Sequence, residues 1–74
     1  MIDKITREQL EDLSDAFDFG TPSEFHEILE EYTGIVAKPY TEYLYIDESG
    51  NYIGDSNDCE LLDLLRNARI EVVG

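Results

Sequence analysis

Apolar residues recur every three or four positions between residues 7 and 19, a spacing that predicts an amphipathic helix. Its apolar face is formed by Leu10, Leu13, Ala16 and Phe17. The segment Thr6-Arg7-Glu8-Gln9 matches a capping box, in which the Thr6 and Gln9 side chains each accept a backbone N–H at the start of the helix. Ile5 and Leu10 are spaced for a hydrophobic staple across that cap. Gly20 ends the segment.

A second helix is predicted directly after Gly20. Thr21 is placed as its N-cap, Pro22 stands at its first position, and Glu24 is placed as the capping glutamate. The apolar stripe of this helix is formed by Phe25, Ile28, Leu29 and Tyr32. Gly34 follows as a C-terminal cap. Because few residues separate the two helices, we expect them to pair at an antiparallel or steep angle.

Beyond the second helix the apolar pattern changes from helical to alternating. Lys38-Pro39 indicates a loop or the entry to a strand. Residues 41–46 are rich in aromatic and β-branched side chains and predict a strand. The two faces of this strand carry, respectively, Leu44 with Ile46 and Tyr43 with Tyr45. Residues 47–51 form a turn in which Gly50 supplies a positive φ angle, and Tyr52-Ile53 completes a hairpin.

A third helix is predicted over the leucine-rich residues 61–68, with capping residues among Ser56, Asn57 and Asp58. Residues 70–73 then form a terminal strand that could join the hairpin. The resulting order, α-α-β-β-α-β, predicts a single small α+β domain over residues 1–74, with a short antiparallel sheet packed on helices.

The composition is strongly acidic, because 18 Asp and Glu against 5 Lys and Arg give a formal net charge of −13 over 74 residues. A chain with this charge is not expected to bind nucleic acid directly or to adhere to an anionic membrane. It contains no run of 18 apolar residues and no basic-then-apolar signal layout, so we expect a soluble, cytoplasmic protein. The single cysteine, Cys59, excludes an internal disulfide and fits a reducing compartment.

The predicted turn after residue 46 is spaced like the start of a calcium-binding loop. The residues at the first ligand positions of such a loop are Asp47, Ser49, Asn51 and Asp55. The match then fails, because Tyr52 stands where the loop needs glycine and Asp58 stands where it needs a bidentate glutamate. An acidic turn is the simpler interpretation, and it leaves weak adventitious binding of Ca²⁺ open.

His26 and Cys59 are the other candidates for chemistry. His26 lacks the second histidine of a helical zinc motif, which indicates a histidine at the edge of the core. Cys59 is predicted in the first turn of the third helix, but its neighbours Asp58 and Glu60 oppose a thiolate there. A small, partly buried thiol is the simpler interpretation. We therefore predict no catalytic residue, no metal site and no cofactor.

The acidic residues are concentrated on the first two helices and in the turns. Glu8 and Asp15 are seven residues apart, or about 10.5 Å along a helix, and the four acids over that length are on average about 3.5 Å apart. One DNA strand carries a phosphate every ~3.4 Å. The second helix repeats this density and contains no Lys or Arg. We predict an acidic partner-binding surface that consists of Glu8, Glu11, Asp12, Asp15, Glu24, Glu27, Glu30, Glu31, Asp47, Glu48, Asp55 and Asp58.

Two interpretations of this surface remain open. Amphipathic helices commonly turn carboxylates to solvent, so the acids can be simple solvated faces. Alternatively, like charges without intervening lysines repel one another, and a Lys- and Arg-rich partner would relieve that repulsion. Tyr40, Tyr43 and Tyr45 support the second interpretation if they project from the side of the hairpin away from the core, because tyrosine is enriched at interfaces. They can equally pack across the strands or cover a helix.

In size, acidity and lack of a catalytic motif, the chain resembles small phage-encoded inhibitors, the anti-CRISPR and anti-restriction proteins that imitate DNA. The resemblance covers the composition of the whole chain and rests on no diagnostic motif. It implies a non-enzymatic inhibitor in the bacterial cytoplasm that competes with nucleic acid for a basic site. The implied partner is a defence nuclease, with a CRISPR effector as the first candidate.

A second resemblance is to the immunity proteins of nuclease bacteriocins. It rests on Tyr43-Leu44-Tyr45, which follows the Glu-rich helix that ends at Tyr32. That family is all-helical with adjacent tyrosines, whereas here Leu44 separates the two tyrosines and a hairpin is predicted. The resemblance implies an interaction module that blocks a nuclease outside its active site.

Overall fold

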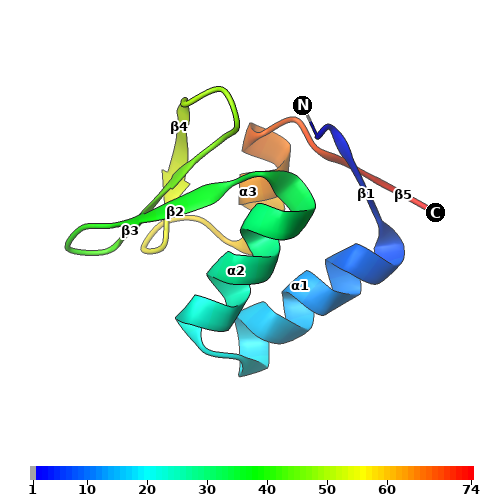
Figure 1. Cartoon of the computed structure of the whole chain (residues 1–74), viewed down its shortest axis with the longest axis horizontal. Coiled ribbons are helices and arrows are strands. Elements are labelled where there is room, and N and C mark those ends of the chain that lie inside the picture. Colours follow the sequence, from blue (N-terminus) through cyan, green and yellow to red (C-terminus); the bar gives the residue numbers. More distant parts are fainter. Residues whose placement is uncertain (1) are drawn as a thin grey trace.

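The computed structural model describes residues 2–74, which form three helices and five strands (Figure 1). In chain order the elements are β1 (Lys4–Thr6), α1 (Arg7–Phe19), α2 (Pro22–Thr33), β2 (Val36–Pro39), β3 (Tyr43–Ile46), β4 (Tyr52–Asp55), α3 (Leu61–Asn67) and β5 (Glu71–Val73). The predicted elements occur in the predicted order, and the α+β fold class is confirmed. The short strands β1 and β2 are additional to the prediction. No helix formed by residues 2–74 has both the length and the apolar character needed to cross a membrane.

The caps of the first two helices follow the local sequence. Gln9 N donates to Thr6 Oγ1 over 3.1 Å and Thr6 N donates to Gln9 Oε1 over 2.9 Å, which confirms the capping box of α1. Thr21 Oγ1 accepts from Glu24 N over 3.2 Å and caps α2. The Glu24 carboxylate lies instead beside Gly20, where an added Cβ would be 3.0 Å from Glu24 Oε2.

The third helix begins later than its capping residues suggested. Glu60 is its N-cap, and Glu60 N donates to Asp63 Oδ2 over 3.2 Å. Residues 56–58 form a turn before the helix, because Asp55 Oδ1 accepts the backbone N–H groups of Asn57 and Asp58 over 3.1 and 2.9 Å. Cys59 therefore precedes α3 and is half-buried against Gly54.

The strands form two separate sheets. Strands β2, β3 and β4 make an antiparallel sheet in that order, whereas β5 pairs in parallel with β1, with Ile5 opposite Val72. The expectation that the terminal strand joins the hairpin is therefore wrong. Ile5 is the staple residue before the cap of α1 and is buried, so the same residue anchors both the helix start and the strand that receives β5.

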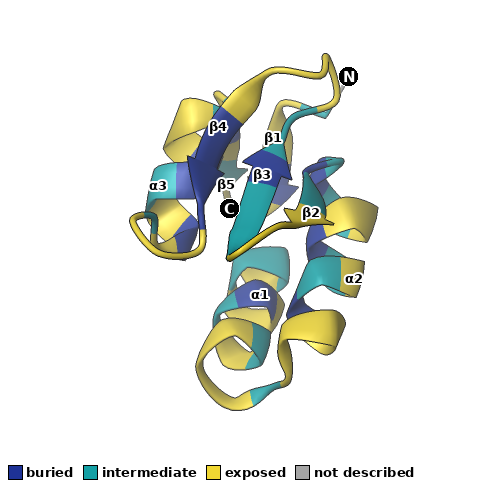
Figure 2. Cartoon of the chain, turned by 90° about the vertical axis from the view of Figure 1, so that its left-hand side faces the viewer, coloured by how far each residue is buried: buried dark blue, intermediate teal, exposed yellow. Residues whose placement is uncertain are grey.

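The core lies where the three helices meet the antiparallel sheet (Figure 2). Tyr45 is only 3% exposed, and Tyr43 is half-buried against the same core. The prediction that both tyrosines lie on the non-core face is wrong, and the alternative that they pack against a helix is confirmed. The Tyr45 hydroxyl is 3.0 Å from His26 Nε2, so this buried hydroxyl has a hydrogen-bond partner inside the protein.

Candidate functional site

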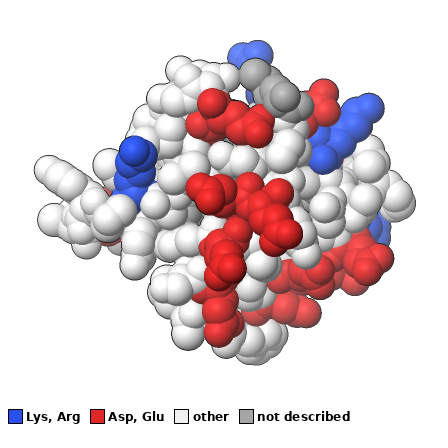
Figure 3. Space-filling model, viewed as in Figure 1, with Lys and Arg blue, Asp and Glu red and all other residues white. Residues whose placement is uncertain are grey.

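The candidate site is a surface that we call the acidic face, formed by the exposed carboxylates of α1 and α2. It consists of Glu8, Glu11, Asp12, Asp15, Glu24, Glu27, Glu30 and Glu31, all of which are exposed. Figure 3 shows acidic side chains gathered over both helices in a single view, with basic side chains at the edges. Carboxylates of both helices therefore lie on one side of the molecule.

Helix geometry explains why the acids lie opposite the core. Successive residues of an α-helix are rotated by about 100°, so the four acids of α1 occupy an arc of about 100° and those of α2 an arc of about 120°. Leu13 of α1 and Leu29 of α2 lie on the opposite sides of their helices and are fully buried. Each helix therefore carries a carboxylate stripe on the side away from the core.

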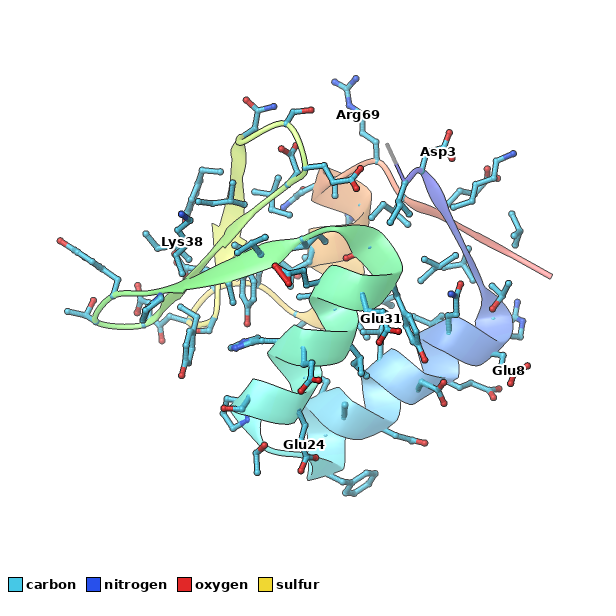
Figure 4. The ribbon with its side chains drawn as sticks, viewed as in Figure 1. Asp3, Glu8, Glu24, Glu31, Lys38 and Arg69 are labelled. Atoms are coloured by element: carbon cyan, nitrogen blue, oxygen red, sulfur yellow. The ribbon has the colours of Figure 1, made fainter. Side chains whose placement is uncertain are left out.

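The two stripes meet at Tyr32. Its hydroxyl donates to Asp12 Oδ2 over 3.1 Å, a hydrogen bond from α2 to α1. This hydrogen bond raises the pKa of Tyr32, and the charges of Asp12, Glu31 and Glu8 raise it further. Figure 4 shows Glu31 on α2 and Glu8 at the start of α1. The phenol of Tyr32 is therefore in hydrogen-bond contact with Asp12 and lies within the electrostatic influence of carboxylates from both helices.

Basic side chains do not neutralise the acidic face. Within residues 2–74, no Lys or Arg forms an ion pair with a carboxylate of α1 or α2, and the ion pair that the structure shows joins Arg66 to Asp63 over 2.7 Å. Lys38 on β2 and Arg69 after α3 lie at other edges of the molecule (Figure 4). The negative potential of the face is therefore screened mainly by solvent ions.

Two of the four predicted turn acids serve the backbone instead of the surface. Asp55 is buried, and its carboxylate accepts from Tyr52 Oη over 2.9 Å as well as from two backbone N–H groups. Its assignment to the partner-binding surface is therefore wrong. Asp47 Oδ1 accepts from Ser49 N and Asn51 N, each over 2.9 Å, and closes the hairpin turn. Glu48 and Asp58 are exposed, outside the two helices.

The candidate metal ligands do not form a metal site. In the part of the chain that the structure describes, no group of three or more His, Cys, Asp and Glu side chains is arranged to hold a metal ion. Asp47 and Asp55 are directed into their own turns, away from a shared calcium site. His26 is half-buried, and this burial lowers its pKa below 6.5.

A groove beside α2 is the feature that the sequence did not indicate. It has a volume of about 310 Å³ and is lined largely by aromatic side chains, namely Phe17, Phe25, His26, Tyr43 and Tyr45. Tyr43 and Tyr45 thus contribute to a surface hollow from the core side of the sheet, whereas Tyr40 is 77% exposed in the loop beyond β2. The available signals were His26 beside the apolar stripe and Phe17 at the end of α1, which helical spacing alone assigns to a core.

The chain matches no protein-family model, no curated protein and no solved structure, so the acidic face and the groove are the basis for any functional proposal.

Proposed function

We propose that this protein is a non-enzymatic inhibitor that binds the basic, nucleic-acid-binding site of a nuclease through its acidic face. The observation that carries the proposal is that the exposed carboxylates of α1 and α2, joined where Tyr32 donates to Asp12, form no ion pair with a basic residue of the described chain. Like charges on one surface repel one another in the free protein, and a Lys- and Arg-rich partner would relieve that repulsion on binding.

The dimensions of the acidic face agree with a nucleic-acid substitute. Along α1 the mean separation of the carboxylates is about 3.5 Å of helix axis, close to the ~3.4 Å phosphate repeat of a DNA strand. The carboxylates of α2 provide a second row beside the first. Following the resemblance to phage-encoded inhibitors, the partner we propose first is a bacterial defence nuclease of the CRISPR type.

A capture experiment tests the proposal. The tagged protein is used to retain proteins from a bacterial lysate that contains a CRISPR effector, in parallel with a Glu27→Lys/Glu30→Lys variant. The matched control is Asp3→Lys/Glu42→Lys, which makes the same change in net charge outside the acidic face. Circular dichroism checks that all three proteins are folded.

We expect the unchanged protein and the control variant to retain the effector and to inhibit its cleavage of DNA, and the acidic-face variant to do neither. An equal loss of binding and inhibition in both variants would mean that the interaction depends only on the net charge of the protein. Retention by the acidic-face variant would place the interface elsewhere and would contradict the proposal.

A further inference from the structure

We propose that the aromatic groove beside α2 receives an arginine side chain of the basic partner. The inference rests on the proposed function and adds to it the chemistry of one specific contact. The groove opens between the α1–α2 turn and strand β3, and its volume of about 310 Å³ is enough for one long side chain.

The rings around the groove form a connected aromatic surface. Phe17 and Phe25 are in edge contact, with ring centroids 5.1 Å apart, and His26 and Tyr43 are in edge contact over 4.4 Å. Phe25 and Tyr45 are each only 3% exposed, so the ring faces open to a ligand are those of Phe17, which is 42% exposed, and of the half-buried Tyr43. Guanidinium groups stack on such faces and are more weakly hydrated than ammonium groups, which favours arginine over lysine here.

The charge beside the groove favours a cation over an anion. None of the residues that line it is Lys or Arg, and Gly20, one of them, has the Glu24 carboxylate beside it. Helix α2 thus contributes Phe25 and His26 to the groove and Glu24 to the acidic face. An arginine in the groove would therefore leave its neighbouring basic residues opposite the carboxylates of α2.

A second copy of this chain is a poor occupant. Each copy carries a net charge of −13, so bringing two grooves together adds repulsion that a small apolar contact does not offset. Polar groups that line the groove are also already used, since His26 Nε2 lies 3.0 Å from Tyr45 Oη and Ser56 Oγ accepts from Tyr43 N over 3.0 Å. What remains available is the aromatic surface, which suits a stacked cation.

The test titrates the isolated full-length protein with N-acetyl-arginine amide and follows the aromatic side chains by NMR. The lysine and norleucine amides are titrated in parallel to separate the guanidinium from any cation and from any apolar chain. We expect saturable shifts at Phe17, His26 and Tyr43 with arginine, smaller ones with lysine and none with norleucine. Phe17→Leu should weaken the arginine affinity about two- to five-fold. The matched control is Phe19→Leu, because Phe19 is 86% exposed, lies two residues away and is outside the groove, and it should have no effect.

Equal shifts with norleucine, absence of shifts in the groove, or shifts that depend on protein concentration alone would each overturn this inference. Failure here is distinguishable from failure of the proposed function. If Phe17→Leu/Tyr43→Leu retains the effector as well as the unchanged protein does, while Glu27→Lys/Glu30→Lys does not, the acidic face stands and the arginine contact is refuted.

Discussion

The hydroxyl of Tyr32 in α2 donates a hydrogen bond to Oδ2 of Asp12 in α1 over 3.1 Å. This contact holds the carboxylate stripes of the two helices side by side. A charged surface that has to match a basic site benefits from such fixed spacing, because less conformational freedom is lost on binding.

The titration of Tyr32 reports directly on that arrangement. Its pKa should lie above 10.0, because Asp12 accepts its proton in a hydrogen bond and the nearby carboxylates disfavour a phenolate. Asp12→Asn should lower this pKa toward its ordinary value, and Glu8→Gln should lower it less. NMR of tyrosine-labelled protein measures both. An unchanged Tyr32 titration in Asp12→Asn would show that the two helices are not joined at this point.

The stability of the free protein should rise with salt. Raising the ionic strength from about 0.1 M to about 1 M shortens the screening length from about 10 Å to about 3 Å, which weakens repulsion within the acidic face. Urea unfolding should therefore give a larger free energy of unfolding at the higher salt concentration. Glu27→Gln/Glu30→Gln should be more stable than the unchanged protein at low salt, with a difference that shrinks as salt is added.

Asp3→Asn/Glu42→Gln is the matched control for this prediction, since it removes two charges outside the acidic face. It should stabilise the protein less than Glu27→Gln/Glu30→Gln does. An equal gain from both pairs would mean that the repulsion is a property of the total charge and has no special site.

Lowering the pH should cost stability through His26. Burial lowers the pKa of His26 below 6.5, so the folded protein favours the neutral ring. This contribution is present above pH 6.5 and is lost as the pH falls through the lowered pKa. Protonation of carboxylates acts in the opposite direction, so the comparison is made with His26→Gln. Between about pH 7 and about pH 5, the unchanged protein should lose stability relative to His26→Gln in urea unfolding. A constant difference would contradict the prediction.

Asp55 should matter for folding and not for binding. Asp55→Ala leaves the two N–H groups and the Tyr52 hydroxyl without their acceptor, and we expect a loss of about 1–3 kcal/mol in the free energy of unfolding. Asp58→Ala removes an exposed carboxylate in the same turn and should change stability little. Equal losses would indicate that Asp55 is no more structural than its neighbour.

Features that depend on adjacent residues could be predicted from the sequence. The caps at Thr6 and Thr21 and the left-handed turn at Gly34 are local, and the structure confirms each of them. The acidic face could also be predicted from the sequence, because helical spacing alone decides which side of α1 or α2 a carboxylate occupies. The hydrogen bond from Tyr32 to Asp12, which joins the two helices, could not be predicted without knowing how the helices pack.

Features that depend on distant residues could not be predicted in this way. Strand β5 pairs with β1, almost the whole chain away, and a three-residue strand has too little pattern to reveal its partner. Apolar character predicts that Leu44 and Ile46 form the core face of β3 and that the tyrosines form the other face. The prediction is wrong because the Tyr45 hydroxyl forms a hydrogen bond with His26 of α2, which allows the tyrosine to be buried. The groove could not be predicted for the same reason, because residues of α2 and of strand β3 form it together.

The most direct test of the central claim is competition on the captured effector. Fluorescently labelled double-stranded DNA is bound to the purified effector, and its displacement is followed by anisotropy as the protein is added. We predict full displacement by the unchanged protein and by Asp3→Lys/Glu42→Lys, weaker at high salt, and none by Glu27→Lys/Glu30→Lys. A stable ternary complex of effector, DNA and this protein would contradict the account and would identify a surface outside the nucleic-acid site.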